Sequence, residues 1–255
     1  MILVLCCTHI DVKHNNIAAI ASAASSRIIG GTSIDISLVP YQVGLSVGGD
    51  FKCGGVIVST TAVITSAQCV KGVTVSTITV RAGSSFRSTL GTVHTVSSLV
   101  IHPSFSSTTY DYDIAILRFS TAFTLGTTVG VATLPSVGET LAAGSVANVT
   151  GWGLSAVGGT SFSGNLQVTQ VPIVATSVCA AALSRINTIT DRMLCAGYTT
   201  GGHDVCTGDT GGPLTYGGKV VGLVSWGASC GAIGSPAVYA KISTLRAWIS
   251  TEAGV

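Results

Sequence analysis

Residues 208–213 read Gly-Asp-Thr-Gly-Gly-Pro, and this segment constrains the fold and function of the chain more than any other. Glycine tolerates positive φ and close backbone approach, so successive N–H groups in such a segment can point into one concavity. A hydroxyl presented there, in this case that of Thr210, would face donors arranged for an anion, as acyl transfer requires. On its own the segment would fit an ordinary glycine-rich turn, so the rest of the chain has to decide between the two interpretations.

The composition favours strands and turns over helices. Only 9% of the 255 residues are charged, and small and β-branched residues dominate. The length suits one large all-β domain or two fused barrels. The net charge of +2 is not concentrated in a basic run, so we expect neither nucleic acid nor a membrane as a partner. No apolar run approaches the roughly 18 residues that a membrane span requires.

The eight cysteines indicate disulfides in a secreted protein. None stands at C-x-x-C spacing or beside histidines at the spacing of zinc ligands, so we expect no metal and no cofactor. Residues 1–7 are apolar and end in two cysteines. We interpret them as the end of a secretion signal, within a signal and pro-segment that covers residues 1–27; a disordered leader is the alternative.

Several blocks occur in the order that is typical of one family. Residues 208–213 resemble the G-D-S-G-G-P nucleophile loop of the chymotrypsin/trypsin family of serine proteases. Residues 27–31 (R-I-I-G-G) resemble its activation site, and residues 53–69 resemble its C-G-G…T-A-A-H-C block. Residues 113–117 (D-I-A-I-L) resemble the block that carries the triad acid, and residues 225–227 (S-W-G) its substrate-flanking strand. The resemblance continues in order to the end of the chain.

The resemblance implies an all-β fold of two six-stranded antiparallel β-barrels, with the site in the cleft between them. We expect the N-terminal barrel over residues 28–125. The C-terminal barrel is expected over residues 126–255, so that residues 28–255 form one peptidase-like domain. Apolar residues at helical spacing near the C-terminus independently predict an amphipathic terminal helix.

Three residues fall on the positions of the family's catalytic triad, and two of them differ in type. Asp113 matches the acid, but Gln68 stands in place of histidine and Thr210 in place of serine. An amide has no protonation equilibrium near neutral pH, so Gln68 cannot act as a general base. The threonine methyl group stiffens χ1 and crowds the approach to a carbonyl. Gly208 and Thr210 occupy the oxyanion-hole positions. From these differences we expect a protein that is not an enzyme.

The resemblance also implies a specificity pocket that differs from the family at one wall. Asp204 matches the acceptor of a basic side chain, with Ser225, Trp226 and Gly227 beside it. Ala237 stands on the opposite wall, where trypsin-like members have glycine. A methyl group in a slot sized for an arginine stem costs about 1–3 kcal/mol.

Three local features add expectations outside the triad. A cut after Arg27 would create an α-amino group on Ile28 that neutralises the carboxylate of Asp209, because a buried unpaired charge is costly. Asn148 begins the one N-x-T sequon, whose use depends on which way its side chain faces. The six cysteines outside residues 1–27 allow 15 different sets of three disulfides. The resemblance implies the pairs Cys53–Cys69, Cys179–Cys195 and Cys206–Cys230.

Within this family, the chain resembles the inactivated serine protease paralogues of parasitic scabies mites, relatives of the mite group 3 trypsin-like allergens. This similarity implies a secreted, monomeric pseudoprotease of the gut lumen that binds host proteins and interferes with complement. One alternative is a weak or residual trypsin-like endopeptidase that uses Thr210. Another is a decoy for protease inhibitors, against which Ala237 argues because a decoy needs an open pocket.

Overall fold

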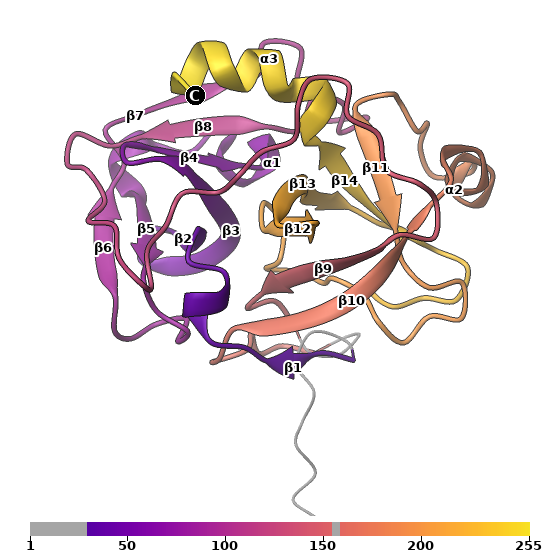
Figure 1. Cartoon of the computed structure of the whole chain (residues 1–255), viewed down its shortest axis with the longest axis horizontal. Coiled ribbons are helices and arrows are strands. Elements are labelled where there is room, and N and C mark those ends of the chain that lie inside the picture. Colours follow the sequence, from indigo (N-terminus) through magenta and orange to yellow (C-terminus); the bar gives the residue numbers. More distant parts are fainter. Residues whose placement is uncertain (1–29, 155–158) are drawn as a thin grey trace, which may run out of the picture.

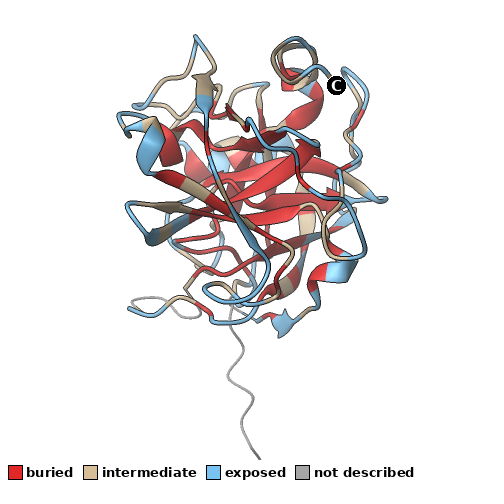
Figure 2. Cartoon of the chain, turned by 90° about the vertical axis from the view of Figure 1, so that its left-hand side faces the viewer, coloured by how far each residue is buried: buried red, intermediate tan, exposed pale blue. Residues whose placement is uncertain are grey.

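The computed structural model describes residues 30–154 and 159–255, and these residues form two β-barrels that lie side by side (Figure 1). Most of the regular structure is antiparallel strand. Buried residues run along the strands of both barrels, whereas the connecting loops are exposed (Figure 2). The prediction of an all-β fold with two barrels is therefore confirmed.

The first barrel is built from strands whose side chains alternate between its interior and its surface, as the period of a strand requires. Within β5, Ile78, Val80 and Ala82 are buried, while Thr79 and Arg81 are partly exposed. In spatial order the strands are β6 (Thr92–Thr95), β5 (Ile78–Ala82), β2 (Gln42–Val47), β3 (Asp50–Ser59), β4 (Ala62–Thr65), β8 (Ala115–Arg118) and β7 (Ser98–Ile101).

The edge strands β6 and β7 are consecutive in the chain, and only Val96 and Ser97 separate them. Within the described residues no ladder joins these two strands. The amide of Val96 donates to the carbonyl of Ile78 (3.2 Å), and that of Ser97 donates to the carbonyl of Arg118 (2.9 Å). The two edges are therefore one bent strand, and the barrel closes through this bend.

The second barrel closes by ladder pairing, because β10 (Gln167–Val174) pairs with both β11 (Met193–Ala196) and β9 (Val146–Gly151). The ring is completed by β14 (Ala237–Lys241), β13 (Lys219–Trp226) and β12 (Pro213–Tyr216). A further strand, β1 (Thr32–Ser33), lies outside this ring on the edge of β10. The described chain thus begins on the second barrel before it builds the first.

The predicted terminal helix is α3 (Ile242–Ala253), which lies across the top of the molecule in Figure 1. Leu245 and Ile249 are buried in one apolar cluster with Ile116 of β8 and Leu223 of β13. This shared cluster contains strands of both barrels, so its burial stabilises their packing against each other. The other helices are α1 (Ala67–Val70), at the end of β4, and α2 (Thr176–Leu183), on the outside of the second barrel.

Candidate active site

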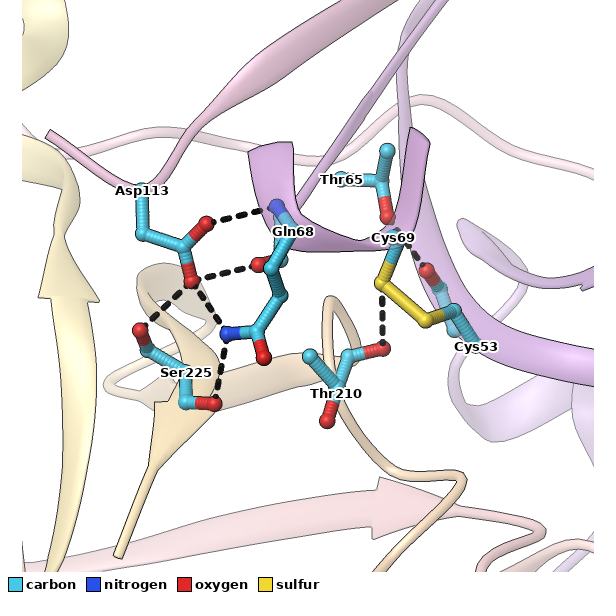
Figure 3. The surroundings of a disulfide bond; sticks show 9 residues. Cys53, Thr65, Gln68, Cys69, Asp113, Thr210 and Ser225 are labelled. Atoms are coloured by element: carbon cyan, nitrogen blue, oxygen red, sulfur yellow. Dashed lines mark hydrogen bonds between the residues drawn. A yellow bond between two sulfur atoms is a disulfide. The ribbon is translucent and has the colours of Figure 1, made fainter. Parts of the chain in front are cut away.

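The three residues predicted at the triad positions lie in one cleft between the barrels, although they come from distant parts of the chain (Figure 3). Gln68 belongs to α1, which the Cys53–Cys69 disulfide ties to β3. Asp113 stands two residues before the start of β8, and Thr210 lies in the loop before β12. The packing of the two barrels therefore brings together three residues that lie far apart in the sequence.

Asp113 is almost completely buried (1% exposed) and accepts four hydrogen bonds. The hydroxyls of Ser66 and Ser225 donate to its Oδ2 (2.5 and 2.6 Å). Gln68 donates its backbone N–H to Oδ1 (3.0 Å) and its side-chain Nε2 to Oδ2 (2.7 Å). Ser66 was not predicted to take part in the site. The one sequence feature that could have indicated it is its position two residues before Gln68, at the start of a helix.

The side chain of Gln68 is held in one orientation. Its Nε2 donates to Oδ2 of Asp113 and also to the carbonyl oxygen of Ser225 (2.8 Å), so both N–H groups are used. Rotating the amide by half a turn would place its oxygen against two acceptors, which excludes that orientation. The amide oxygen lies on the side of Thr210 in Figure 3. Gln68 therefore offers the cleft an acceptor.

The loop of residues 208–212 bends so that two of its backbone amides are left without acceptors among the described residues. The amides of Asp209, Gly211 and Gly212 donate to backbone carbonyls at 2.8–3.0 Å, whereas those of Gly208 and Thr210 do not. Gly208 has a φ of +95°, and a Cβ there would lie 2.8 Å from a ring carbon of Phe162. These are the two amides predicted to form an oxyanion hole, and their geometry provides adjacent free donors.

Thr210 is anchored through its backbone. Its carbonyl oxygen accepts from the amide of Gly54 in β3 (2.8 Å). Sγ of Cys69 lies 3.7 Å from the same oxygen; this is a packing contact, because a disulfide sulfur carries no hydrogen. Within the part of the chain that the structure describes, no hydrogen bond joins the side chains of Thr210 and Gln68.

A pocket of about 290 Å³ opens beside Thr210, and all the predicted pocket residues line it: Asp204, Ser225, Trp226, Gly227 and Ala237. Ala237 lies on the wall facing Gly227: its Cα would lie 3.8 Å, an ordinary contact distance, from a Cβ at Gly227. Ala237 is nearly fully buried (2% exposed), so its methyl group is a fixed part of that wall.

Asp204 is buried in this pocket and accepts hydrogen bonds from the amides of Val205 (2.8 Å) and Gly231 (2.7 Å). Burial raises the pKa of Asp204 to about 6, against the opposing effect of the two hydrogen bonds. The contribution of Gly231 was not predicted; its position directly after Cys230, which pairs with Cys206, was the available signal.

Asp209 points away from the pocket into the second barrel and is fully buried. It accepts from the amides of Gly153 (2.8 Å) and Cys206 (3.0 Å). A Cβ on Gly151 or Gly153 would come within 2.1 and 2.4 Å of its oxygens, so only glycine fits there. Burial raises the pKa of Asp209 to about 7. The predicted partners Arg27 and Ile28 lie outside the described residues, so the activation step stays a prediction.

The remaining predicted features are the disulfides, the sequon and the expected absence of a membrane span and of a metal. Disulfides join Cys53–Cys69, Cys179–Cys195 and Cys206–Cys230, the pairs that the resemblance implied. Asn148 is exposed on β9, and its side-chain oxygen accepts from Gln170 (3.3 Å). Among residues 30–154 and 159–255, no helix has the length and hydropathy of a membrane span, and no cluster of His, Cys, Asp and Glu side chains is arranged to hold a metal ion.

Comparison with known proteins gives a consistent result. A family model described as Trypsin matches residues 28–249. A vitellin-degrading protease of Bombyx mori is 41% identical over 226 residues, which cover 88% of this chain and 84% of the relative. Trypsin delta and Trypsin gamma of Drosophila melanogaster are each 39% identical over 228 residues, which cover 89% of this chain and 88% of each relative.

These comparisons correct one prediction. The expectation that the chain is not an enzyme is wrong, because the relatives at 39–41% identity are named as proteases and trypsins. The prediction gave too much weight to the residue types at positions 68 and 210. The hydroxyl of Thr210, the oxyanion-hole amides and the acidic pocket, each expected from the resemblance, lie together in the cleft. The finer similarity to mite paralogues stays a prediction.

Proposed function

The chain belongs to the trypsin family of serine proteases, and from this premise we propose that it is a weak trypsin-like endopeptidase whose nucleophile is the hydroxyl of Thr210. One observation carries this proposal. The backbone amides of Gly208 and Thr210 are without acceptors among the described residues, and Thr210 itself lines the mouth of the pocket that contains Asp204. A nucleophile, two donors and a binding pocket thus share one location.

The proposed reaction is an acyl transfer. The oxygen of Thr210 bonds to the scissile carbonyl carbon, and the carbonyl electron pair moves onto its oxygen, where the two amides donate to the resulting anion. The hydroxyl proton passes to a solvent base, because Gln68 cannot take it. The carbon–nitrogen bond then breaks, the amine leaves with a proton from water, and a second water hydrolyses the threonyl ester.

The rate is expected to be low. In a comparable triad, removal of the triad members leaves a catalysis of about 10³–10⁴-fold over water, which comes from the oxyanion hole and from substrate binding. Gln68 makes its side-chain hydrogen bonds to Asp113 and Ser225 and none to Thr210, so we expect it to add little to this residual rate.

The proposed substrates carry a basic side chain before the scissile bond. The acidic pocket supports this, because an ammonium or guanidinium group pairs with the carboxylate of Asp204. The pKa of Asp204 is raised to about 6 by burial, so cleavage is expected to increase as the pH rises through 6. The methyl group of Ala237, a lining residue of this pocket, is expected to reduce the room for the stem of an arginine.

The test uses the chain matured at Ile28, fluorogenic arginyl and lysyl peptides, and two threonine variants prepared in the same way. We expect slow hydrolysis by the parent protein, loss of that hydrolysis in Thr210→Ala, and no loss in the control Thr251→Ala, which changes an exposed threonine of α3. Mass spectrometry should detect an acyl group on Thr210. Absence of hydrolysis, or hydrolysis that survives Thr210→Ala, would overturn the proposal.

A second candidate function is the binding of a protein partner. The amide of Gln68, which donates to Asp113 and Ser225 and cannot act as a base, favours this function because peptide cleavage is then slow compared with binding. We propose host proteins of the complement system as these partners, with secretion supported by the three disulfides. Binding of purified complement components to the monomeric protein, unchanged in Thr210→Ala, would support it. Absence of measurable binding to any of these components would refute it.

A further inference from the structure

Arg87 lies in the loop between β5 and β6 of the first barrel, where this loop contacts the second barrel. Its loop is held by the second barrel, since the amide of Arg87 donates to the carbonyl of Gly164 (3.0 Å) and that of Leu166 donates to the carbonyl of Ser85 (2.7 Å). The guanidinium carbon of Arg87 lies 5.4 Å from the ring centre of Phe51 and 5.7 Å from that of Phe162. Cation–π contact with two rings fixes the position of this charge.

This cluster of Arg87, Phe51 and Phe162 is adjacent to the reacting groups. The rings of Phe51 and Phe162 pack edge to face with centres 5.2 Å apart. Phe162 in turn covers Gly208, where a Cβ would lie 2.8 Å from its ring. One of the two free amides therefore lies directly beside the aromatic part of the cluster.

The cluster lies away from the side of Thr210 that holds the basic residue of the substrate. None of its three residues lines the pocket of Asp204. In Figure 3, Ser225 lies on one side of Thr210 and the Cys53–Cys69 disulfide on the other, and Phe51 belongs to the same strand as Cys53. A peptide whose basic side chain occupies the pocket must therefore continue past the disulfide toward Phe51 and Arg87 after the scissile bond.

The guanidinium of Arg87 has donors to spare. Its Nε donates to the carbonyl of Ser163 (3.2 Å), and among the described residues neither terminal nitrogen has an acceptor. Three ion pairs occur within residues 30–154 and 159–255, and none involves Arg87. The exposed charges beside Phe51 on β3 are Asp50 and Lys52, one of each sign. A planar guanidinium with free N–H groups matches a carboxylate.

We infer that Arg87, Phe51 and Phe162 form a subsite for the residues that follow the scissile bond, and that this subsite selects an acidic side chain. The inference rests on the proposed function, because it deepens the substrate specificity of the same cleft. Arg87 would pair with the carboxylate, and the two rings would contact the apolar part of the peptide. The protein would thus prefer a basic residue before the bond and an acidic residue soon after it.

The experiment compares peptides with arginine before the scissile bond and glutamate, alanine or lysine at the first, second or third position after it, all with amidated ends. We expect glutamate to raise kcat/KM over lysine by about five- to tenfold at one or more positions, the size expected of a partly exposed, charge-assisted pair. Arg87→Ala should remove this preference, and Arg87→Glu should reverse it. Arg185→Ala, which removes an exposed charge beyond α2, should leave it unchanged.

A binding measurement separates this inference from the proposed function. Fluorescence anisotropy with uncleavable versions of the glutamate and lysine peptides reports the subsite even without turnover. Cleavage without preference would overturn the subsite and leave the endopeptidase in place. A preference in binding that Arg87→Glu reverses, without cleavage, would support the subsite and defeat the endopeptidase. Absence of any preference in either assay would overturn the inference, provided that circular dichroism shows the variants to be folded.

Discussion

Gln68 and Asp113 are joined by two hydrogen bonds, one from the backbone N–H to Oδ1 (3.0 Å) and one from the side-chain Nε2 to Oδ2 (2.7 Å). The pair crosses from α1 to the loop before β8. In the triad of a serine protease, the acid holds the base in this way. Here the same contact holds the amide of Gln68. The supporting hydrogen bonds are therefore present, but the residue that they hold cannot take up a proton as histidine does.

The first prediction concerns the stability of this contact. Asp113→Asn keeps the shape of the side chain but replaces one carboxylate oxygen with an NH₂ group. Four hydrogen-bond donors point at this side chain, so the NH₂ group would face donors instead of acceptors. We expect the free energy of unfolding to fall by about 2–4 kcal/mol, because a buried hydrogen-bond network is left partly unsatisfied. Urea denaturation measures the change. Asp35→Asn, at an exposed residue, serves as control and should change stability little; an equal loss in both variants would contradict the prediction.

The second prediction concerns the missing base. A histidine at position 68 would donate one ring N–H to Asp113 and present its other nitrogen toward Thr210. We expect Gln68→His to raise kcat on an arginyl peptide by about 10²–10⁴-fold, the usual contribution of general base catalysis. Initial rates at saturating peptide measure it. Gln68→Ala should show no gain, and a similar rate in both variants would show that the amide is not what limits the chemistry.

The third prediction concerns the wall of the pocket. Ala237→Gly removes a methyl group from the lining of the pocket of Asp204, where we expect it to reduce the room for an arginine stem. We expect kcat/KM for arginyl peptides to rise about tenfold, because the overpacking of about 1–3 kcal/mol is relieved. The control is Ala240→Gly. Ala240 lies on the same strand but belongs to the apolar cluster shared with α3, so this variant measures the cost of placing glycine in the strand. A gain of the same size in Ala240→Gly would rule out the steric explanation.

The fourth prediction concerns the pH dependence of stability in the chain that keeps residues 1–27. The pKa of Asp209 is raised by burial from 3.8 to about 7 in the folded state. Between these values the folded state binds more protons at Asp209 than the unfolded state, so the stability contributed by this group is fully present below pH 4 and is lost as the pH rises toward 7. The free energy of unfolding should fall by an amount on the order of 4 kcal/mol, at about 1.4 kcal/mol per pH unit.

Denaturation midpoints at pH 4 to 8 measure this dependence. Asp209→Asn should flatten the profile, although the raised pKa of Asp204, about 6, leaves a weaker slope below pH 6. The chain that begins at Ile28 should also have a flatter profile, because a new α-amino group next to Asp209 would favour its charged form. A steep fall that persists in Asp209→Asn would assign the pH dependence to another group.

The sequence by itself determined the fold, the order of the blocks and the residue types in the cleft. Composition and local patterns indicated strands and turns and the amphipathic last helix. The two-barrel fold and the site positions of Gln68, Asp113, Thr210 and Asp204 followed from the resemblance of the blocks to one family. The conclusion that the chain is not an enzyme was wrong, because it gave the residue types at positions 68 and 210 more weight than the rest of the site.

Only the tertiary structure decided how those residues act. The orientation of the Gln68 amide depends on a carbonyl of Ser225, 157 positions away. The free amides beside Thr210 are recognised only because their neighbours are paired with groups from other segments. The position of Arg87 over Phe51 and Phe162 requires both barrels to meet. Hydrogen bonds and cation–π contacts are short-ranged, so residues far apart in sequence acquire these roles only when packing brings them within a few ångströms.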